Sequence, residues 1–348
     1  MRASLVVIAV VFGLALVAEA GTDTAGALPW NALARDLVAT GRLDPLEASR
    51  VYALLSVAQH LALGPAPASE QAAVATASAH VLGRLFPSHV TRAGEDRSAS
   101  ASLGERVARD VIERALSDGS DRAGDRAEPP VGAGGWRADR VAVKPRWGQV
   151  RPWLMSRGDQ LRPPPPPASG SREFDEALGV VRRISHTRTP QQVSLAERWA
   201  DGAGSATPPG HWNAIASELI ERHDLDARRA TFVLAILNMA MMDSGIAAWD
   251  AKYAYGLLRP WQADPTITTV VARPDFPSYV SGHSAFSGAA AVVLGHFFPT
   301  ERETLARMAQ DASDSRVHAG LHYDFDCEKG LALGRAVGRL ALAHARSP

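Results

Sequence analysis

The sequence contains almost no cysteine and no excess of charge of either sign. Cys327 is the only cysteine in 348 residues, so no disulfide can form within the chain. A single thiol without a neighbouring base in the sequence is expected to be a packed, unreactive residue. Lys plus Arg and Asp plus Glu number 37 each, which gives a net charge of zero. This balance argues against nucleic acid or an anionic membrane surface as a partner.

Long apolar runs are also scarce. Residues 1–20 combine Arg2, an uncharged stretch and Ala18-Glu19-Ala20, which predicts a signal peptide and a secreted or periplasmic protein. The alternative, an uncleaved anchor helix, is disfavoured because the run is shorter than the ~20 residues that spanning requires. Residues 276–300 lack Asp, Glu, Lys and Arg but contain two histidines and four serines. They predict a buried core helix, so no stable membrane span is expected in the mature chain.

Few segments look like strands, whereas helical periodicity recurs along the chain, so an all-α helical bundle is predicted. We expect a single mainly helical domain at 21–348. It would comprise N-terminal helices at 28–117, a loop and proline-rich strap at 118–170, and a catalytic helical core at 171–346.

Several helices can be located from the pattern. The residues 44–47 (Asp-Pro-Leu-Glu) predict a capped helix start. The segment 226–258 is apolar almost all round and should be central. Two further helices are expected at 284–298 and 328–345. The five prolines at 163–167 predict an extended polyproline II strap.

The chemistry concentrates in three short segments near the C-terminal end. They are 252–260 (KYAYGLLRP), 277–283 (PSYVSGH) and 315–326 (SRVHAGLHYDFD). One lysine and two arginines beside histidines form the set that would hold a multiply charged tetrahedral oxyanion and carry out proton or nucleophile chemistry on it.

In the first segment Trp249, Lys252 and Arg259 have helical spacing and should share one face, with the helix ending at Arg259 because a proline follows. A lysine and an arginine presented by a central apolar helix need an anion, since an unpaired buried charge is costly. The alternative is pairing with nearby acids, namely Asp243, Asp250 or Asp264.

In the second segment Ser281 is a plausible N-cap, and the free N–H groups that follow it could bind an oxyanion. Gly282 would let the backbone approach the ligand closely. His283 would lie in the first turn, at the edge of the anion site. The alternative is an ordinary capped helix with an incidental histidine.

In the third segment Asp326 follows His322 by four residues, so on a helix the carboxylate could orient the imidazole. Arg316 precedes both. A metal triad of His318, His322 and Asp326 is the competing interpretation. It is disfavoured because no fourth ligand and no general-base glutamate accompanies the histidines.

Taken together, the three segments read Lys-x6-Arg-Pro, Ser-Gly-His and Ser-Arg-x5-His-x3-Asp. This order and spacing resembles the superfamily that unites vanadium-dependent haloperoxidases, type 2 phosphatidic acid phosphatases and bacterial class A acid phosphatases. The likeness to its soluble bacterial haloperoxidase-like branch extends over 136–170, 186–189, 211–213 and 243–260.

The resemblance implies a role for each residue of the site. The vanadate or phosphate oxygens would be bound by Lys252, Arg259 and Arg316, with further hydrogen bonds from Ser281 and the Gly282 amide. His322 would bond to the vanadium or attack phosphorus, and Asp326 would support it. His283 would be the acid–base group.

The resemblance also implies a halide pocket, at Trp249 and Phe276, although both could be core aromatics. The sequence departs from the pattern in three places. Val280 stands where proline is frequent, Leu258 replaces an aromatic, and Asp324 replaces a basic residue. An acid at position 324 could weaken oxyanion binding, which leaves the ligand open.

Three functions are compatible with this site. A vanadium-dependent haloperoxidase would use hydrogen peroxide to oxidise halide at a bound vanadate, with Lys252 polarising the peroxide. An acid phosphatase would hydrolyse a phosphate ester through a phosphohistidine and need no cofactor. The third is a helical protein that only binds oxyanions. A homodimer through residues 51–63 is possible, although this segment could equally be core.

Overall fold

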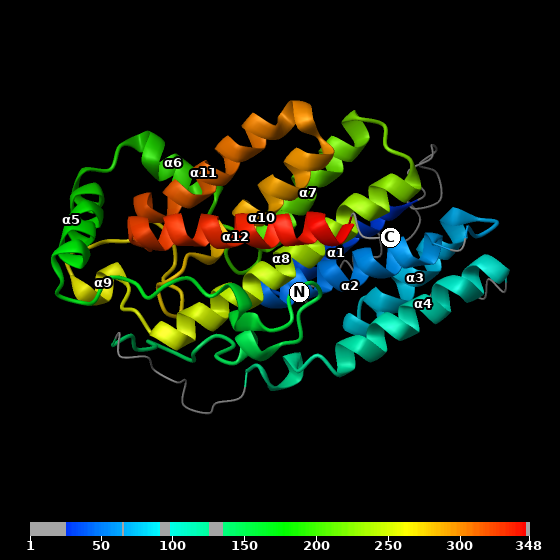
Figure 1. Ribbon diagram of the computed structural model, residues 1–348, viewed down its shortest axis with the longest axis horizontal. Coiled ribbons are helices and arrows are strands. Elements are labelled where there is room, and N and C mark those ends of the chain that lie inside the picture. Colours follow the sequence, from blue (N-terminus) through cyan, green and yellow to red (C-terminus); the bar gives the residue numbers. More distant parts are fainter. Residues whose placement is uncertain (1–25, 65, 91–97, 125–134, 346–348) are drawn as a thin grey trace, which may run out of the picture.

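The computed structural model describes residues 26–64, 66–90, 98–124 and 135–345. Within these ranges every regular element is a helix, and strand pairing is limited to two isolated bridges (Figure 1). The all-α prediction is therefore confirmed. The predicted signal peptide lies outside the described residues.

The helices follow one another with short connections. The α-helices are α1 (Ala27–Thr40), α2 (Pro45–Leu63), α3 (Glu70–Leu85), α4 (Ala99–Leu116), α5 (Arg172–Thr187), α6 (Pro190–Arg198), α7 (Thr207–Arg222), α8 (Ala227–Tyr255), α9 (Pro260–Ala263), α10 (Gly282–Phe297), α11 (Arg302–His318) and α12 (Asp324–Ala345). Short 3-10 turns, η1 to η4, lie at Ser120–Arg122, Trp147–Gln149, Gly158–Leu161 and Pro299–Glu301. The predicted capping box of α2 is present, with Asp44 accepting from Leu46 N and Glu47 N.

Helix α8 runs through the centre of the molecule, as its apolar character predicts. It packs against α2, α10 and α12 (Figure 1). By length and composition α8 could cross a membrane, but 89% of its most apolar window is buried inside the protein. The helix ends at Tyr255 because Gly256 adopts the left-handed conformation, with φ 61°. The predicted extension to Leu258 is therefore wrong, and Arg259 lies beyond the helix.

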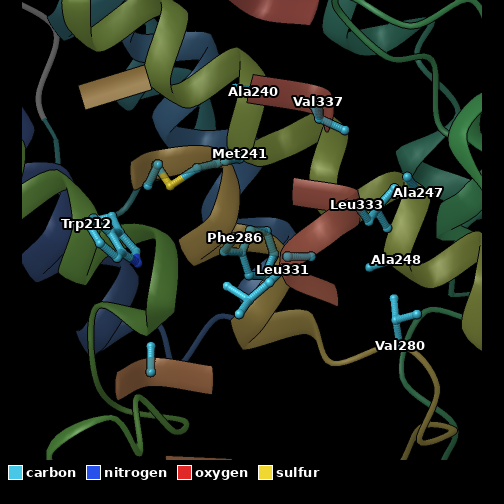
Figure 2. Close-up of a cluster of buried hydrophobic side chains, with 14 of the residues drawn as sticks. Trp212, Ala240, Met241, Ala247, Ala248, Val280, Phe286, Leu331, Leu333 and Val337 are labelled. Atoms are coloured by element: carbon cyan, nitrogen blue, oxygen red, sulfur yellow. The ribbon is translucent and has the colours of Figure 1, made fainter. Parts of the chain in front are cut away.

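Close packing of α10 against α12 brings together the two helices that carry much of the candidate site. A Cβ at Gly334 would lie 2.0 Å from the Ala285 carbonyl oxygen, so only glycine allows this approach. Around the crossing, Phe286 of α10 and Leu331, Leu333 and Val337 of α12 join the core cluster that Figure 2 shows.

A buried amide network fixes α8 to the N-terminal helices. Asn213 of α7 accepts hydrogen bonds from Asn31 of α1 and from Asn238 of α8, at 2.8 and 2.9 Å. Asn238 also donates to Ser56 Oγ of α2 at 2.9 Å. These side chains are fully buried, and such networks specify one arrangement of the helices because a broken one leaves polar groups unpaired.

The proline strap lies against the site helices. Tyr255 and Tyr279 donate to the carbonyl oxygens of Pro163 and Pro164, both at 2.7 Å. Upstream of the prolines, the Asp243 carboxylate accepts three backbone N–H groups, from Trp153, Leu154 and Met155. Burial raises the pKa of Asp243 to about 6 despite these bonds. The chain from Trp153 to Pro164 is thus held at both of its ends.

The glycine contact predicts a difference between two substitutions. Gly334→Ala should lower the free energy of unfolding by about 1–3 kcal/mol, because the added methyl group overpacks the α10–α12 contact. Gly179→Ala in α5, where a Cβ would meet nothing within 4 Å, should leave stability unchanged or raise it by up to about 1 kcal/mol. Urea unfolding measures both. Equal effects of the two substitutions would contradict the packing argument.

Candidate active site

Lys252 and Arg259 lie together at the C-terminal end of α8, and both are fully buried. Lys252 Nζ donates to the carbonyl oxygens of Pro277 and Ser278 at 2.8 and 2.9 Å. Arg259 donates from Nε to the Phe276 carbonyl oxygen at 3.0 Å. The backbone segment 276–278 therefore orients both cations, although they do not share a helical face.

The acids that could have neutralised these two cations have other partners. Asp243 holds the strap, as described above. Asp250 forms a bidentate ion pair with Arg162, at 2.6 and 2.9 Å, and Asp264 pairs with Arg182. Among the described residues, neither Lys252 nor Arg259 has a carboxylate within 4.0 Å. The alternative that nearby acids simply pair with them is therefore wrong.

Helix α10 begins at the site, as predicted. Ser281 is its N-cap and accepts from Ser284 N at 3.3 Å. Gly282 and His283 follow in the first turn, where backbone N–H groups have no partner within the helix. A Cβ at Gly282 would lie 3.2 Å from the Trp249 ring, so glycine permits this close approach.

His322 and Asp326 form a buried pair, with 2.8 Å between Nδ1 and Oδ2. Arg259 Nη1 lies 2.9 Å from His322 Nε2. Because a guanidinium can only donate, Nε2 accepts and Nδ1 carries the proton that is donated to Asp326. His322 precedes α12, as predicted, and Asp326 in the first turn of that helix reaches the imidazole.

Burial lowers the pKa of every basic group at the site. For Lys252 and the two histidines, repulsion by neighbouring cations lowers the pKa further. The pKa of His322 is well below its usual value, first because of burial and then because of Arg259 and Lys252. For His283 the lowering comes from burial, then from Arg316. Burial, followed by Arg259, also lowers the pKa of Lys252 well below 10.5. Both imidazoles are therefore neutral near neutral pH.

The remaining charged groups show the same effect of burial. It lowers the pKa values of Arg259 and Arg316 to about 10 and raises that of Asp326 to about 6. Arg316, on α11, is oriented by donating to Ser315 Oγ and the Ala196 carbonyl oxygen at 2.8 and 3.0 Å. Lys252 and Arg259 thus lie near the Asp326 carboxylate, whereas the carboxylate that acts on Arg316 is Asp201.

A cavity of about 270 Å³ opens onto this cluster. Six predicted site residues line it, namely Trp249, Phe276, Gly282, His283, Arg316 and His322. The Trp249 and Phe276 rings are 4.7 Å apart. Lys252 Nζ lies 5.0 Å from the Phe276 ring centroid, so the predicted halide pair adjoins the cations.

Val280 and Asp324, two of the positions at which the sequence departs from the superfamily pattern, lie in different surroundings. Val280 is fully buried next to Ser281. Asp324 is exposed at the start of α12, accepts from Phe325 N at 2.8 Å, and lines a separate cavity. The concern that Asp324 would weaken the oxyanion site is therefore wrong.

The metal triad is not formed. No three His, Cys, Asp or Glu side chains of the described residues are grouped as a metal ion would require. Cys327 is buried, and burial raises the pKa of its thiol to about 12, as expected of a packing residue. Sequence reasoning missed Ser278, which donates to Asp326 Oδ2. Ser278 lies within the second segment, but spacing alone did not connect it to Asp326.

The residues fit a tetrahedral oxyanion such as vanadate or phosphate. Arg259 Nη2 and His283 Nε2 are buried and have no hydrogen-bond partner among the described residues, and a buried polar atom without a partner costs free energy. Lys252, Arg259, Arg316 and the Gly282 amide could donate to the anion oxygens, and His322 Nε2 could bond to its central atom. The excess of buried positive charge favours such a ligand.

The chain is similar in sequence to known proteins of two kinds. Residues 230–346 match the model of the PAP2 superfamily. The chain is 27% identical over 169 residues to the vanadium chloroperoxidase of Curvularia inaequalis, covering 38% of this chain and 28% of that protein. It is also 27% identical over 188 residues to the non-specific acid phosphatase of Providencia stuartii, covering 52% of this chain and 72% of that protein.

Solved structures show the same fold. A bacterial vanadium-dependent iodoperoxidase superposes with a TM-score of 0.79 at 23% identity, covering 93% of this chain and 97% of that chain. An apo-type bacterial vanadium-dependent chloroperoxidase gives 0.70 at 13% identity, with coverages of 87% and 94%. The resemblance to the superfamily of vanadium haloperoxidases and PAP2 phosphatases is therefore confirmed. These relatives are enzymes of two kinds, vanadium haloperoxidases and an acid phosphatase.

The excess of buried cations predicts strong stabilisation by an oxyanion. Orthovanadate or phosphate at ~100 times its Kd should stabilise the folded protein by about 2.7 kcal/mol, seen as a rise in Tm. Lys252→Met should lose most of that rise, whereas Arg162→Met, which removes an ion pair outside the cluster, should keep it. A full rise in Tm for Lys252→Met would contradict an oxyanion cage formed by Lys252, Arg259, Arg316 and the Gly282 amide.

The lowered pKa of Lys252 predicts a pH dependence. A group with a lowered pKa loses its charge at lower pH than usual, and an anion binds the charged form. The affinity for sulfate, whose own charge stays constant, should therefore fall as pH rises, starting well below pH 10.5. Calorimetry over the neutral to alkaline range would measure this fall. In Lys252→Met the fall should be absent; an identical profile would assign it to another group.

Proposed function

We propose that this protein is a vanadium-dependent haloperoxidase, which uses hydrogen peroxide to oxidise halide ions. The observation that carries this proposal is the Trp249–Phe276 pair, which lines the cavity beside Lys252. Aromatic edges and adjacent cations can hold a weakly hydrated halide ion beside an oxyanion. A plain phosphate-binding site would not need such a pair.

Vanadate, when bound, would make an oxygen of hydrogen peroxide electrophilic enough for a halide ion to attack it. Lys252, Arg259 and Arg316 would bind its oxygens and balance their negative charge. Since these cations are held by backbone carbonyls and Ser315, they need little reorganisation during the reaction, which is the basis of electrostatic catalysis.

His283 is the group that moves protons in this proposal. Its lowered pKa keeps it neutral near neutral pH, so its unpartnered Nε2 can accept a proton from hydrogen peroxide. The resulting imidazolium can return that proton to the oxygen that leaves as water. One proton, one peroxide and one halide ion then yield hypohalous acid and water.

His322 would hold the oxyanion at Nε2. Its tautomer is fixed by Asp326, which accepts the Nδ1 proton, and Ser278 in turn donates to Asp326. This arrangement keeps the Nε2 lone pair available and directed away from Asp326. Arg259 would release Nε2 and donate to the anion.

Acid phosphatase activity is the second candidate. It is favoured by the match to the acid phosphatase, which covers 72% of that protein. The same His322 Nε2 could attack a phosphomonoester, and His283 could protonate the leaving alcohol, provided that it is first protonated. Water would then release phosphate from the phosphohistidine. This reaction needs no vanadate, which would act as an inhibitor.

One paired assay separates the candidates. The mature protein with orthovanadate should brominate a diketone when hydrogen peroxide is added, and should hydrolyse a chromogenic phosphate ester poorly. His322→Ala should lower the bromination rate by at least ~100-fold, because changing only a residue that orients a ligand already costs about 10–100-fold. His318→Ala, a nearby histidine outside the cavity lining, should retain activity.

The opposite results would decide against the haloperoxidase. Ester hydrolysis that vanadate inhibits, without halogenation, would establish the phosphatase. Neither activity would support a protein that only binds oxyanions. Export, which the sequence predicts, and dimer formation, which it leaves open, are proposals that secretion assays and sedimentation would test.

A further inference from the structure

The mouth of the cavity carries charge that the proposed reaction does not use. Three exposed arginines line it from three separate segments: Arg42 between α1 and α2, Arg140 between η1 and η2, and Arg273 in the loop before α10. Peroxide is neutral and halide ions are small, so neither explains three guanidinium groups at the entrance.

The carboxylates at the mouth already have partners. Asp275 accepts from Arg140 N at 3.1 Å and pairs with Arg140 Nε at 2.7 Å. Asp201 pairs with His211. Asp44 caps α2, and burial raises its pKa to about 6. The arginines and carboxylates of the mouth are therefore equal in number, but the carboxylates do not all pair with the arginines.

Arg42 and Arg273 differ from Arg140. Among the described residues, neither has a carboxylate within 4.0 Å. Arg273 lies 5.5 Å from the Trp261 ring, and Arg42 Nη1 lies over Gly204, 3.1 Å from where a Cβ would stand. Both guanidinium groups thus have neighbours that orient them but no neutralising anion.

Between this mouth and the cage the walls are largely apolar. Leu43, Val143, Val271 and Phe286 line the cavity together with the Trp249–Phe276 pair. A ligand that fits has an apolar, preferably aromatic body that packs on these walls and an anionic group that reaches the arginines. At about 270 Å³ the cavity admits only a small molecule.

We infer that the cavity binds a small aromatic carboxylate as the organic acceptor of the halogen, with its carboxylate at Arg42 and Arg273 and its ring beside Trp249 and Phe276. This inference rests on the proposed haloperoxidase function. In the reaction, a ring carbon bonds to the halogen of hypohalous acid, the oxygen–halogen bond breaks, and the ring proton leaves with the released hydroxide as water. Hydrogen peroxide is the only oxidant required.

The test compares two acceptors that differ in one charge, 4-hydroxyphenylpropionate and its methyl ester. The acid should have the higher kcat/KM. In the double variant Arg42→Gln/Arg273→Gln the acid-to-ester ratio should fall about five- to tenfold, the size expected of two partly screened charge pairs. Arg307→Gln, an exposed arginine outside the cavity, removes one charge and should leave the ratio unchanged. Added salt should lower the ratio of the wild type.

Binding without peroxide separates this inference from the proposed function. Calorimetry should show the acid binding more tightly than the ester, and the double variant should lose the difference. Preferential binding without halogenation would keep the acceptor site and overturn the haloperoxidase. Halogenation with equal ratios in all variants would overturn the acceptor site. A raised KM for halide with an unchanged acid-to-ester ratio would also overturn it, because the arginines would then only attract halide.

Discussion

The burial of three cations at the candidate site is the constraint on which the rest of the structure depends. Lys252, Arg259 and Arg316 are at most 1% exposed, and isolated charges at such depth cost several kcal/mol each. Backbone carbonyl oxygens recover part of that cost. A bound anion would offset the remainder, so the buried positive charge favours a multiply charged oxyanion at this site.

The surrounding helices hold this unfavourable arrangement in place. The amide network of Asn31, Asn213 and Asn238 and the glycine-mediated contact of α10 with α12 fix the helices. Neither the buried amides nor the backbone contact at Gly334 tolerates much displacement. Rigid packing matters here because repulsion between the cations would otherwise widen the cage and admit water. The stability of the scaffold thus supports a site that is itself destabilising.

Much of the fold and of the site could be predicted from local sequence signals. Such signals act over only a few residues and can therefore be recognised in the sequence. Examples are the capping residues Asp44 and Ser281 and the apolar periodicity of α8. The end of α8 was misplaced, because the left-handed turn at Gly256 overrides the helical spacing of Arg259. The last helix was predicted to begin at position 328 but begins at Asp324, so Asp326 lies in its first turn, where it pairs with His322.

The sequence by itself determined which groups form the candidate site, because the cations, the two histidines and the supporting Asp326 lie in three short segments with recognisable spacing. Only the tertiary structure decided which charges remain unpaired, because Asp243, Asp250 and Asp264 find partners far away in the chain. It also turned Asp324 outward and gathered the arginines of the mouth from three separate segments. Such pairings depend on distances in space, and spacing along the chain does not encode them.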